Sequence, residues 1–249
     1  MRFYLFLLLV PILLAQQPKA PEPSFVRILP VGDMPPWQEK IQNGVRVQIP
    51  PPPGAIPIEK ATMAISESRG ETLSLVLGKM TKYLPLDGSL PSVQLFEDKF
   101  MKGDPWVKAA NRPGTQSLIL LIRDPRQAKP SWKTPIAKMI PDDLISFPPE
   151  SLRFANISAS KIVVRIDEAP AFTLSPGDIV IKKQQAGKVT LLIGTANEGQ
   201  RPKRIYKNRL TIKDGERTGI FIYRSDGKAA DEAPKIRFFP ERPTVPKRK

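Results

Sequence analysis

One short run in this sequence has the residue types and spacing of a nucleophilic site. Residues 158–161 read Ser-Ala-Ser-Lys, which is the S-x-x-K spacing of a serine activated by a lysine. That chemistry needs the two side chains one helical turn apart at the start of a helix. Here the run lies between two segments typical of strands, 152–156 and 162–166. We therefore expect a turn at this position and assign it no catalytic role.

Adjacent acidic residues occur at 142–143, 167–168 and 231–232. Glycoside hydrolysis needs two carboxylates that face each other across a cleft, about 5–10 Å apart. Neighbouring residues on a strand or turn point away from each other, so we expect these acids to be solvated turn residues. They also lack the alternating Asp/Asn-Gly spacing of a calcium loop.

The composition excludes several kinds of enzyme. The chain has neither His nor Cys. This excludes Ser-His-Asp and Cys-His nucleophiles and the common zinc and copper sites. We accordingly assign no catalytic residue, metal ligand or cofactor, and we expect a protein that is not an enzyme.

Positive charge is the strongest chemical signal in the composition. The chain has 39 Lys and Arg against 24 Asp and Glu, a formal net charge of +15. Such a protein is attracted to polyanions, and no specific nucleic acid is implied. The densest basic run, near Lys182, Lys183 and Lys188, is the candidate polyanion-binding surface, with an aromatic residue among its cations: Arg201, Lys203, Arg204, Tyr206, Lys207 and Arg209. The alternative is a solvent-facing hairpin whose cations guard a sheet edge against pairing.

Each of the three tryptophans, Trp37, Trp106 and Trp132, lies near a proline in a loop-like segment. Exposed aromatic rings on the loops of a sandwich can stack on sugars. Packing over the end of a sandwich is the alternative, and it is the one we favour.

The N-terminus has the pattern of a signal peptide. Arg2 precedes an apolar run at 3–14, followed by Ala15 and two glutamines. We expect residues 1–15 to direct export to the periplasm or the extracellular space, with retention as an N-terminal anchor as the alternative. The absence of Cys in an exported chain of this length favours a bacterial source. Residues 16–24 are expected to form a Pro-rich tether, residues 243–249 a basic tail, and the mature chain no transmembrane helix.

The remaining chain reads as short strands separated by turns. Runs rich in Val, Ile, Leu, Phe and Thr alternate with turn residues such as Asp214-Gly215. Residues 45–49 alternate apolar and polar, which predicts a half-buried strand. Only residues 132–140 tolerate a helix. The sequence therefore predicts an all-β chain of two tandem β-sandwich-like domains, at 25–145 and 151–242, with the boundary in the Pro-bearing stretch 141–150.

The two halves contain similar segments. Residues 114–124 and 215–225 each begin with a turn glycine, continue as an apolar strand, and end in Arg plus a small polar or acidic residue, at an offset of 101 residues. A basic segment that contains proline and another possible strand follow both, at 136–141 and at 236–240. Two copies of one β-domain explain the offset, and chance similarity is the alternative.

Residues 150–240 resemble small exported bacterial β-sandwich modules, many of them uncharacterised. The resemblance rests on an R-F-x-N-x-S strand, Arg153 to Ser158, that precedes an L-x-P-G turn, Leu174 to Gly177. It implies a sandwich fold and no particular activity.

Two functions remain open. The first is a non-catalytic exported or envelope-associated binding or structural protein that contacts anionic polymers or another envelope protein. The second is a carboxylate-dependent hydrolase or transglycosylase of the cell envelope. A carboxylate pair lining a cleft would favour the second, and an exposed basic face would favour the first.

Overall fold

The computed structural model describes residues 22–36, 38–124, 131–196, 202–224 and 234–246. Every regular element in these ranges is a strand, which confirms the all-β prediction. Among the same residues, no helix is long and apolar enough to cross a membrane. The signal-peptide segment and Trp37 lie outside the described residues.

The first half of the chain contributes ten strands. Their bounds are β1 (Ser24–Pro30), β2 (Gln38–Gln42), β3 (Val45–Ile49), β4 (Lys60–Ala64), β5 (Gly70–Ser74), β6 (Leu84–Leu86), β7 (Ser92–Phe96), β8 (Val107–Ala110), β9 (Gln116–Ile122) and β10 (Ile136–Pro141). The second half contributes eight: β11 (Ser151–Ile157), β12 (Ile162–Ile166), β13 (Phe172–Leu174), β14 (Ile179–Lys183), β15 (Gly187–Thr195), β16 (Lys203–Ile212), β17 (Arg217–Tyr223) and β18 (Lys235–Glu241).

Each half packs two four-stranded sheets face to face. In the first half, inner sheet 1 has the order β10-β9-β1-β6 and outer sheet 1 has the order β5-β4-β7-β8. An apolar core that includes Ile28, Met63, Leu95 and Ile119 fills the space between them. Two sheets packed face to face over such a core form a β-sandwich.

The second half repeats this arrangement strand by strand. Inner sheet 2 has the order β18-β17-β11-β14, and outer sheet 2 has the order β13-β12-β15-β16. Both inner sheets contain one parallel pair, β1 with β9 and β11 with β17, between antiparallel neighbours. The core of the second half includes Phe154, Val164, Leu191 and Ile220. Among the described strands, only those of the β2–β3 hairpin have no counterpart in the second half.

The 101-residue offset places the two similar segments at equivalent positions. Gly114 and Gly215 both have positive φ angles, 73° and 70°, and each is the third residue of the turn that leads into a central strand, β9 or β17. A left-handed backbone favours glycine at such a turn because glycine has no Cβ.

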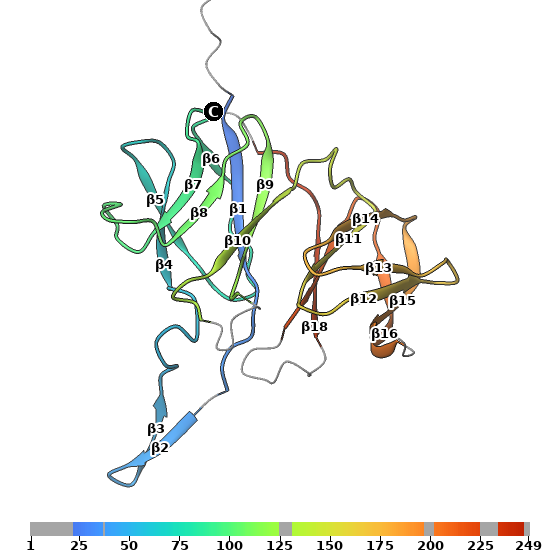
Figure 1. Cartoon of the computed structure of the whole chain (residues 1–249), viewed down its shortest axis with the longest axis horizontal. Helices are drawn as coiled ribbons and strands as arrows, with labels where there is room; N and C mark the ends of the chain where they lie inside the picture. Colours follow the sequence, from blue (N-terminus) through green and yellow to red (C-terminus); the bar gives the residue numbers. More distant parts are fainter. Residues whose placement is uncertain (1–21, 37, 125–130, 197–201, 225–233, 247–249) are drawn as a thin grey trace, which may run out of the picture.

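The two inner sheets also pack against each other. A third apolar cluster joins Leu118, Leu120 and Ile140 of inner sheet 1 to Ala155 and Phe221 of inner sheet 2. Strands β1, β11 and β17 have seven residues each, and all of these residues are buried because both faces of the strands are covered. The inner sheets lie in the middle of the molecule and the outer sheets on its flanks (Figure 1).

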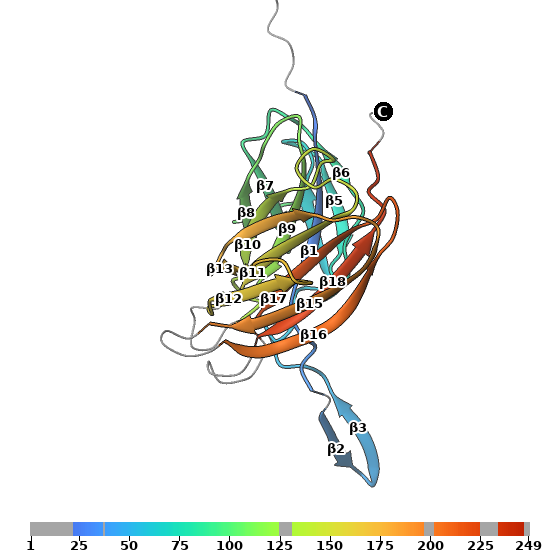
Figure 2. The same cartoon turned by 90° about the vertical axis from the view of Figure 1, so that its right-hand side faces the viewer.

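Two local predictions were wrong. The helix candidate at 132–140 contains strand β10, because its backbone pairs with β9. Residues 45–49 do form a strand, β3, but it is exposed instead of half-buried. Among the described strands it pairs only with β2, and this hairpin projects away from both sandwiches (Figure 2).

Candidate functional site

Outer sheet 2 has an unusual charge composition. Its four strands contain six Lys and Arg residues and no Asp or Glu: Arg165, Lys188, Lys203, Arg204, Lys207 and Arg209. The equivalent strands of outer sheet 1 contain only Lys60, Lys108 and Glu71. Outer sheet 2 is therefore much more positively charged than outer sheet 1, although the two sheets have the same topology.

Strand alternation determines which of these cations face solvent. Val189, Leu191 and Ile193 of β15 point into the core, so their neighbours in β15 point outward. Residues paired across antiparallel strands share a face. Arg165 and Lys207 therefore lie on the outer face, because both pair with Leu192. Arg209, which pairs with Thr190, and Lys188 lie on the same face.

The run predicted from the sequence largely lies along β16, the edge strand of this sheet. Lys203, Arg204, Lys207 and Arg209 are exposed, whereas Arg201 lies outside the described residues. A β-bulge opposite Ile193 and Gly194 shifts the register within β16. Gly194 pairs with Arg204, which returns the Arg204 side chain to the outer face.

Tyr206 does not join these cations. It pairs with Ile193, points toward the core, and packs against the Phe238 ring with centroids 5.1 Å apart. Lys182 and Lys183 belong to β14, the edge of inner sheet 2, and the Lys182 ammonium lies 4.8 Å from the Phe172 ring centroid. The candidate surface is thus cationic without an aromatic platform.

No described acidic residue forms an ion pair with Arg165, Lys188, Arg204, Lys207 or Arg209, the five cations that we call the basic face. Alternate residues on a strand are about 6.8 Å apart, and neighbouring strands are about 4.8 Å apart. The face therefore presents an array of cations that form no ion pair with an acidic residue in the part of the chain that the structure describes. Such an array can hold several phosphate or carboxylate groups of one extended chain.

A second concentration of charge is buried between the inner sheets. The Asp142 carboxylate is fully buried; one oxygen accepts a bond from Arg27 Nε at 2.6 Å and the other from an Arg153 terminal nitrogen at 2.9 Å. Arg217 lies 3.4 Å from the same carboxylate and also binds the carbonyl oxygen of Phe147. The Phe147 ring lies against both Arg153 and Arg217.

Glu241 at the end of β18 completes this cluster. Its carboxylate accepts two bonds from Arg27, each 2.6 Å long, and one from Arg217 at 2.9 Å. The Tyr83 hydroxyl donates to Asp142 at 2.6 Å, and its ring stacks on the Arg27 guanidinium. Three arginines and two carboxylates leave the cluster with one net positive charge.

The pKa shifts in this cluster follow from burial and charge. Burial favours a raised pKa for Asp142, but the guanidinium groups of Arg153 and Arg27 outweigh burial and hold that pKa below its ordinary value. Burial lowers the pKa of Arg153 and raises the pKa of Tyr83 well above its ordinary range. Asp142 is therefore ionised, Tyr83 is neutral, and the cluster stays ionic near neutral pH.

Sequence reasoning did not find this cluster. Asp142 was expected in a solvated turn, and that expectation was wrong, because the side chain is enclosed by residues from β1, β11 and β17. No local pattern in the sequence points to it, because it depends on long-range pairing. Arg27 pairs with Leu118 and Arg153 pairs with Gly219, and Leu118 and Gly219 are 101 residues apart. The two arginines are thus equivalent residues of the two halves.

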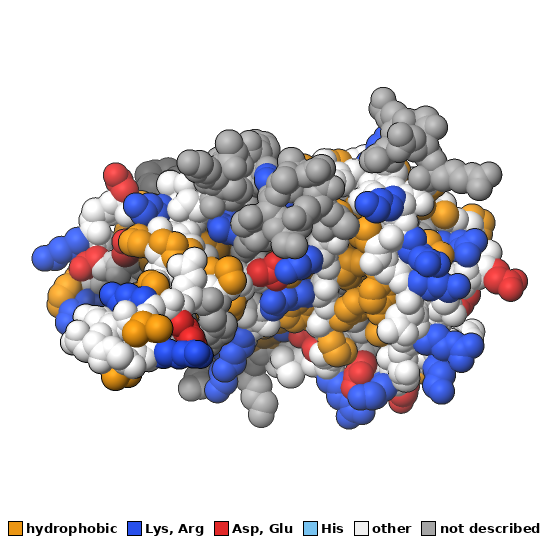
Figure 3. Space-filling model, turned by 90° about the horizontal axis from the view of Figure 1, so that it is seen from below, with side chains coloured by type: hydrophobic (Ala, Val, Ile, Leu, Met, Phe, Trp, Pro, Cys, Tyr) orange, Lys and Arg blue, Asp and Glu red, His pale blue; other side chains and the backbone are white. Residues whose placement is uncertain are grey.

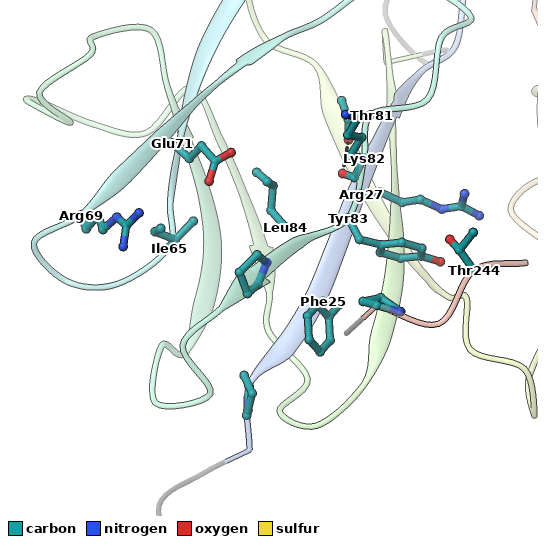
Figure 4. Close-up of a pocket in the computed structure, with 13 residues that line it drawn as sticks. Phe25, Arg27, Ile65, Arg69, Glu71, Thr81, Lys82, Tyr83, Leu84 and Thr244 are labelled. Atoms are coloured by element: carbon teal, nitrogen blue, oxygen red, sulfur yellow. Dashed lines mark hydrogen bonds between the residues drawn. The ribbon is translucent and has the colours of Figure 1, made fainter. Parts of the chain in front are cut away.

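A groove lies at the open side of the first sandwich, where the edge strands β5 and β6 of its two sheets face each other. Its volume is about 740 Å³, and Phe25, Ile65, Tyr83 and Thr244 are among its lining residues (Figure 4). Glu71 is the only carboxylate among the described residues that line it. A second groove of about 430 Å³ lies at the equivalent place in the second half, and there Asp167 is the only described lining carboxylate. Neither groove supplies a facing carboxylate pair from the part of the chain that the structure describes.

The other sequence motifs have structural roles in the described residues. Ser158 lies in the turn after β11, where its hydroxyl donates to Asn156 Oδ1 at 2.7 Å. Trp132 is buried in the first core, and Trp106 Nε1 donates to the Trp132 carbonyl oxygen at 3.1 Å. These two tryptophans therefore pack with the first core and do not present exposed rings.

No family model matches this chain, and no curated protein matches it. The basic face and the buried charge cluster are thus the observations from which a function can be inferred.

Proposed function

We propose that this chain is a non-catalytic, exported or envelope-associated binding protein that holds an extended anionic polymer against the basic face. The observation that carries this proposal is the composition of outer sheet 2, with six cations and no acid in its strands. Cations on one face attract a polyanion and release its counterions when it binds.

Protection of a sheet edge does not account for the whole face. Lys and Arg on an edge strand discourage pairing with other sheets, and this applies to β16. Arg165 and Lys188, however, belong to β12 and β15, which are the two interior strands of the sheet. Their exposed cations extend the positive surface away from the edge, which supports a binding role.

Two copies of one sandwich unit account for the architecture. The strand orders of the two halves correspond, and the 101-residue offset aligns β9 with β17. In this interpretation, outer sheet 1 and outer sheet 2 began as equivalent surfaces. The accumulation of cations on only one of them then supports a specialised role for the second half.

The carboxylate-dependent hydrolase is not supported by a specific feature of the described residues. Each groove has one described lining carboxylate, whereas glycoside hydrolysis uses two. Asp142 and Glu241 are close to each other but are occupied by arginines and enclosed between the sheets.

Fluorescence anisotropy with labelled polyphosphate and labelled polyglutamate tests the proposal and separates phosphate from carboxylate recognition. The variant R204S/K207S/R209S removes three cations from the face. The control K60S/K79S/K108S removes three exposed cations from the first half. Each cation near an anionic surface contributes about 1 kcal/mol, so the first variant should bind at least tenfold more weakly. Equal losses of affinity in both variants would contradict the proposal.

A further inference from the structure

The β2–β3 hairpin is the one described element of the first half without an equivalent in the second. It lies between β1 and β4, whereas the equivalent strands β11 and β12 are joined by a short turn at 158–161. The hairpin, which we call the arm, projects from the body in two perpendicular views (Figures 1 and 2). It is therefore an insertion into a sandwich unit that is complete without it.

The arm contributes nothing to the three apolar cores. All five residues of β2 and four of the five residues of β3 are exposed, and none belongs to a core cluster. Asn43 and Gly44 both have positive φ angles, 52° and 77°, as a two-residue hairpin turn of type I′ requires. An isolated two-stranded hairpin is marginally stable in water, so packing against another surface would stabilise it.

The arm also combines exposed apolar side chains with cations. Pairing places Val45, Val47 and Ile49 on one face, with Lys40 opposite Val47. Ile41 lies on the other face opposite Arg46 and is 74% exposed, and Val45 is 63% exposed. Exposed apolar side chains next to cations suit the surface of an anionic bilayer, because binding there increases with the apolar area buried and with electrostatic attraction to the lipids.

Charge distinguishes among the surfaces that could cover the arm. The arm has Lys40 and Arg46 against Glu39, and the Arg46–Glu39 pair is long, 4.0 Å, and exposed. The chain as a whole is strongly positive, so a second copy would be repelled. Seen from below, the side toward which the arm projects, Lys and Arg side chains spread across the molecular surface with fewer Asp and Glu (Figure 3). An anionic surface with an apolar interior complements this arrangement.

From these observations we infer that the arm is a membrane-surface anchor, which places Ile41, Val45 and Val47 in the interfacial region of an anionic lipid bilayer. Electrostatic attraction brings the basic protein to the bilayer, and burial of the apolar side chains keeps the arm there. Because the contact needs only the arm and the net charge of the protein, this function is independent of polymer binding by the basic face.

The absence of Cys permits a site-specific test in the full chain. Gln42→Cys carries the environment-sensitive dye NBD next to the turn, on the same face as Val45. The control is Ile145→Cys with the same dye, because Ile145 is 94% exposed on the body of the protein. Vesicles of phosphatidylglycerol and phosphatidylcholine, with pure phosphatidylcholine as the neutral comparison, are added to each labelled protein.

The inference predicts a blue shift and brighter NBD emission at position 42 on anionic vesicles, with no change at position 145. The double variant V45S/V47S should reduce vesicle cosedimentation at least tenfold, while R204S/K207S/R209S retains the dye response at position 42. An unchanged dye signal on anionic vesicles, or undiminished cosedimentation of V45S/V47S, overturns the inference. A dye response that depends on protein concentration without vesicles also overturns it, because a second copy then covers the arm.

Discussion

Arg27 and Arg153 bind the two oxygens of one buried carboxylate, that of Asp142, from equivalent positions in the two halves of the chain. The nitrogen–oxygen distances are 2.6 Å and 2.9 Å. Arg27 lies in inner sheet 1 and Arg153 in inner sheet 2, so Asp142 links the two sandwiches through ion pairs. The apolar cluster that includes Leu120 and Phe221 surrounds the same interface.

Replacement of Asp142 with Asn should therefore destabilise the whole protein. The variant leaves Arg153 and Arg217 buried without a carboxylate partner at this position, and breaking a buried pair in this way costs about 3–5 kcal/mol. Urea denaturation of the full chain measures this change in the free energy of unfolding. Asp104→Asn is the control, because Asp104 is exposed and should change stability by less than about 0.5 kcal/mol. Equal stabilities of the two variants would refute the role given to Asp142.

The carboxylate of Asp142 should also make the stability of the protein fall at acid pH. The pKa of Asp142 is lower in the folded protein than in the unfolded chain, where it is about 3.9. Its contribution is therefore complete above about pH 4 and is lost as the pH falls through the lower, folded value. The urea midpoint of the natural protein should fall more steeply between about pH 4 and 2 than that of Asp142→Asn. Parallel curves would show that Asp142 does not carry this dependence.

At alkaline pH, the ionisation of Tyr223 should lower the stability of the folded protein. Its hydroxyl donates to Asp33 at 2.9 Å, and burial raises the pKa of Tyr223 to about 12. The contribution of neutral Tyr223 to stability is complete below about pH 10 and is lost as the pH rises through about 12. Absorbance titration at the tyrosinate band should show a component near pH 12 that disappears in Tyr223→Phe, while the still later titration of Tyr83 remains. A titration that is unchanged by this substitution would contradict the assignment.

Fragments of the second half, cut on either side of the predicted domain boundary, should show how much residues 142–150 stabilise that half. Phe147 and Asp142 lie in the 141–150 stretch, yet both are buried against Arg153 and Arg217. A fragment of residues 142–242 should therefore unfold at higher urea concentration than one of residues 151–242. Both fragments should bind the dye ANS, because Ala155 and Phe221 become exposed. Identical midpoints for the two fragments would show that residues 142–150 do not stabilise the second half.

The sequence was sufficient for the fold class because strand periodicity and turn glycines are local signals. Gly114 and Gly215 lie at their predicted turns, and the offset between them aligns equivalent strands. The burial of Asp142 could not be predicted in the same way. It depends on the parallel pairing of β1 with β9 and of β11 with β17, and those partners lie far apart in the sequence.

The candidate site was predicted only in part, because some of its residues are brought together by pairing between distant strands. The basic run along β16 is local and was found, apart from Arg201, which lies outside the described residues. Arg165 and Lys188 join the basic face only through the register of β12, β15 and β16. Tyr206 was grouped with the cations because it is adjacent in sequence, but strand alternation turns its side chain toward the core.

The salt dependence of polyphosphate binding tests the central claim most directly. Removing one cation that binds a phosphate should reduce the slope of log K against log salt concentration by about 0.7–0.9. R204S/K207S/R209S should therefore have a slope smaller by roughly 2–3 than the natural protein, whereas K60S/K79S/K108S should nearly keep the natural slope. Equal slopes for the natural protein and R204S/K207S/R209S would contradict a polyanion site on outer sheet 2.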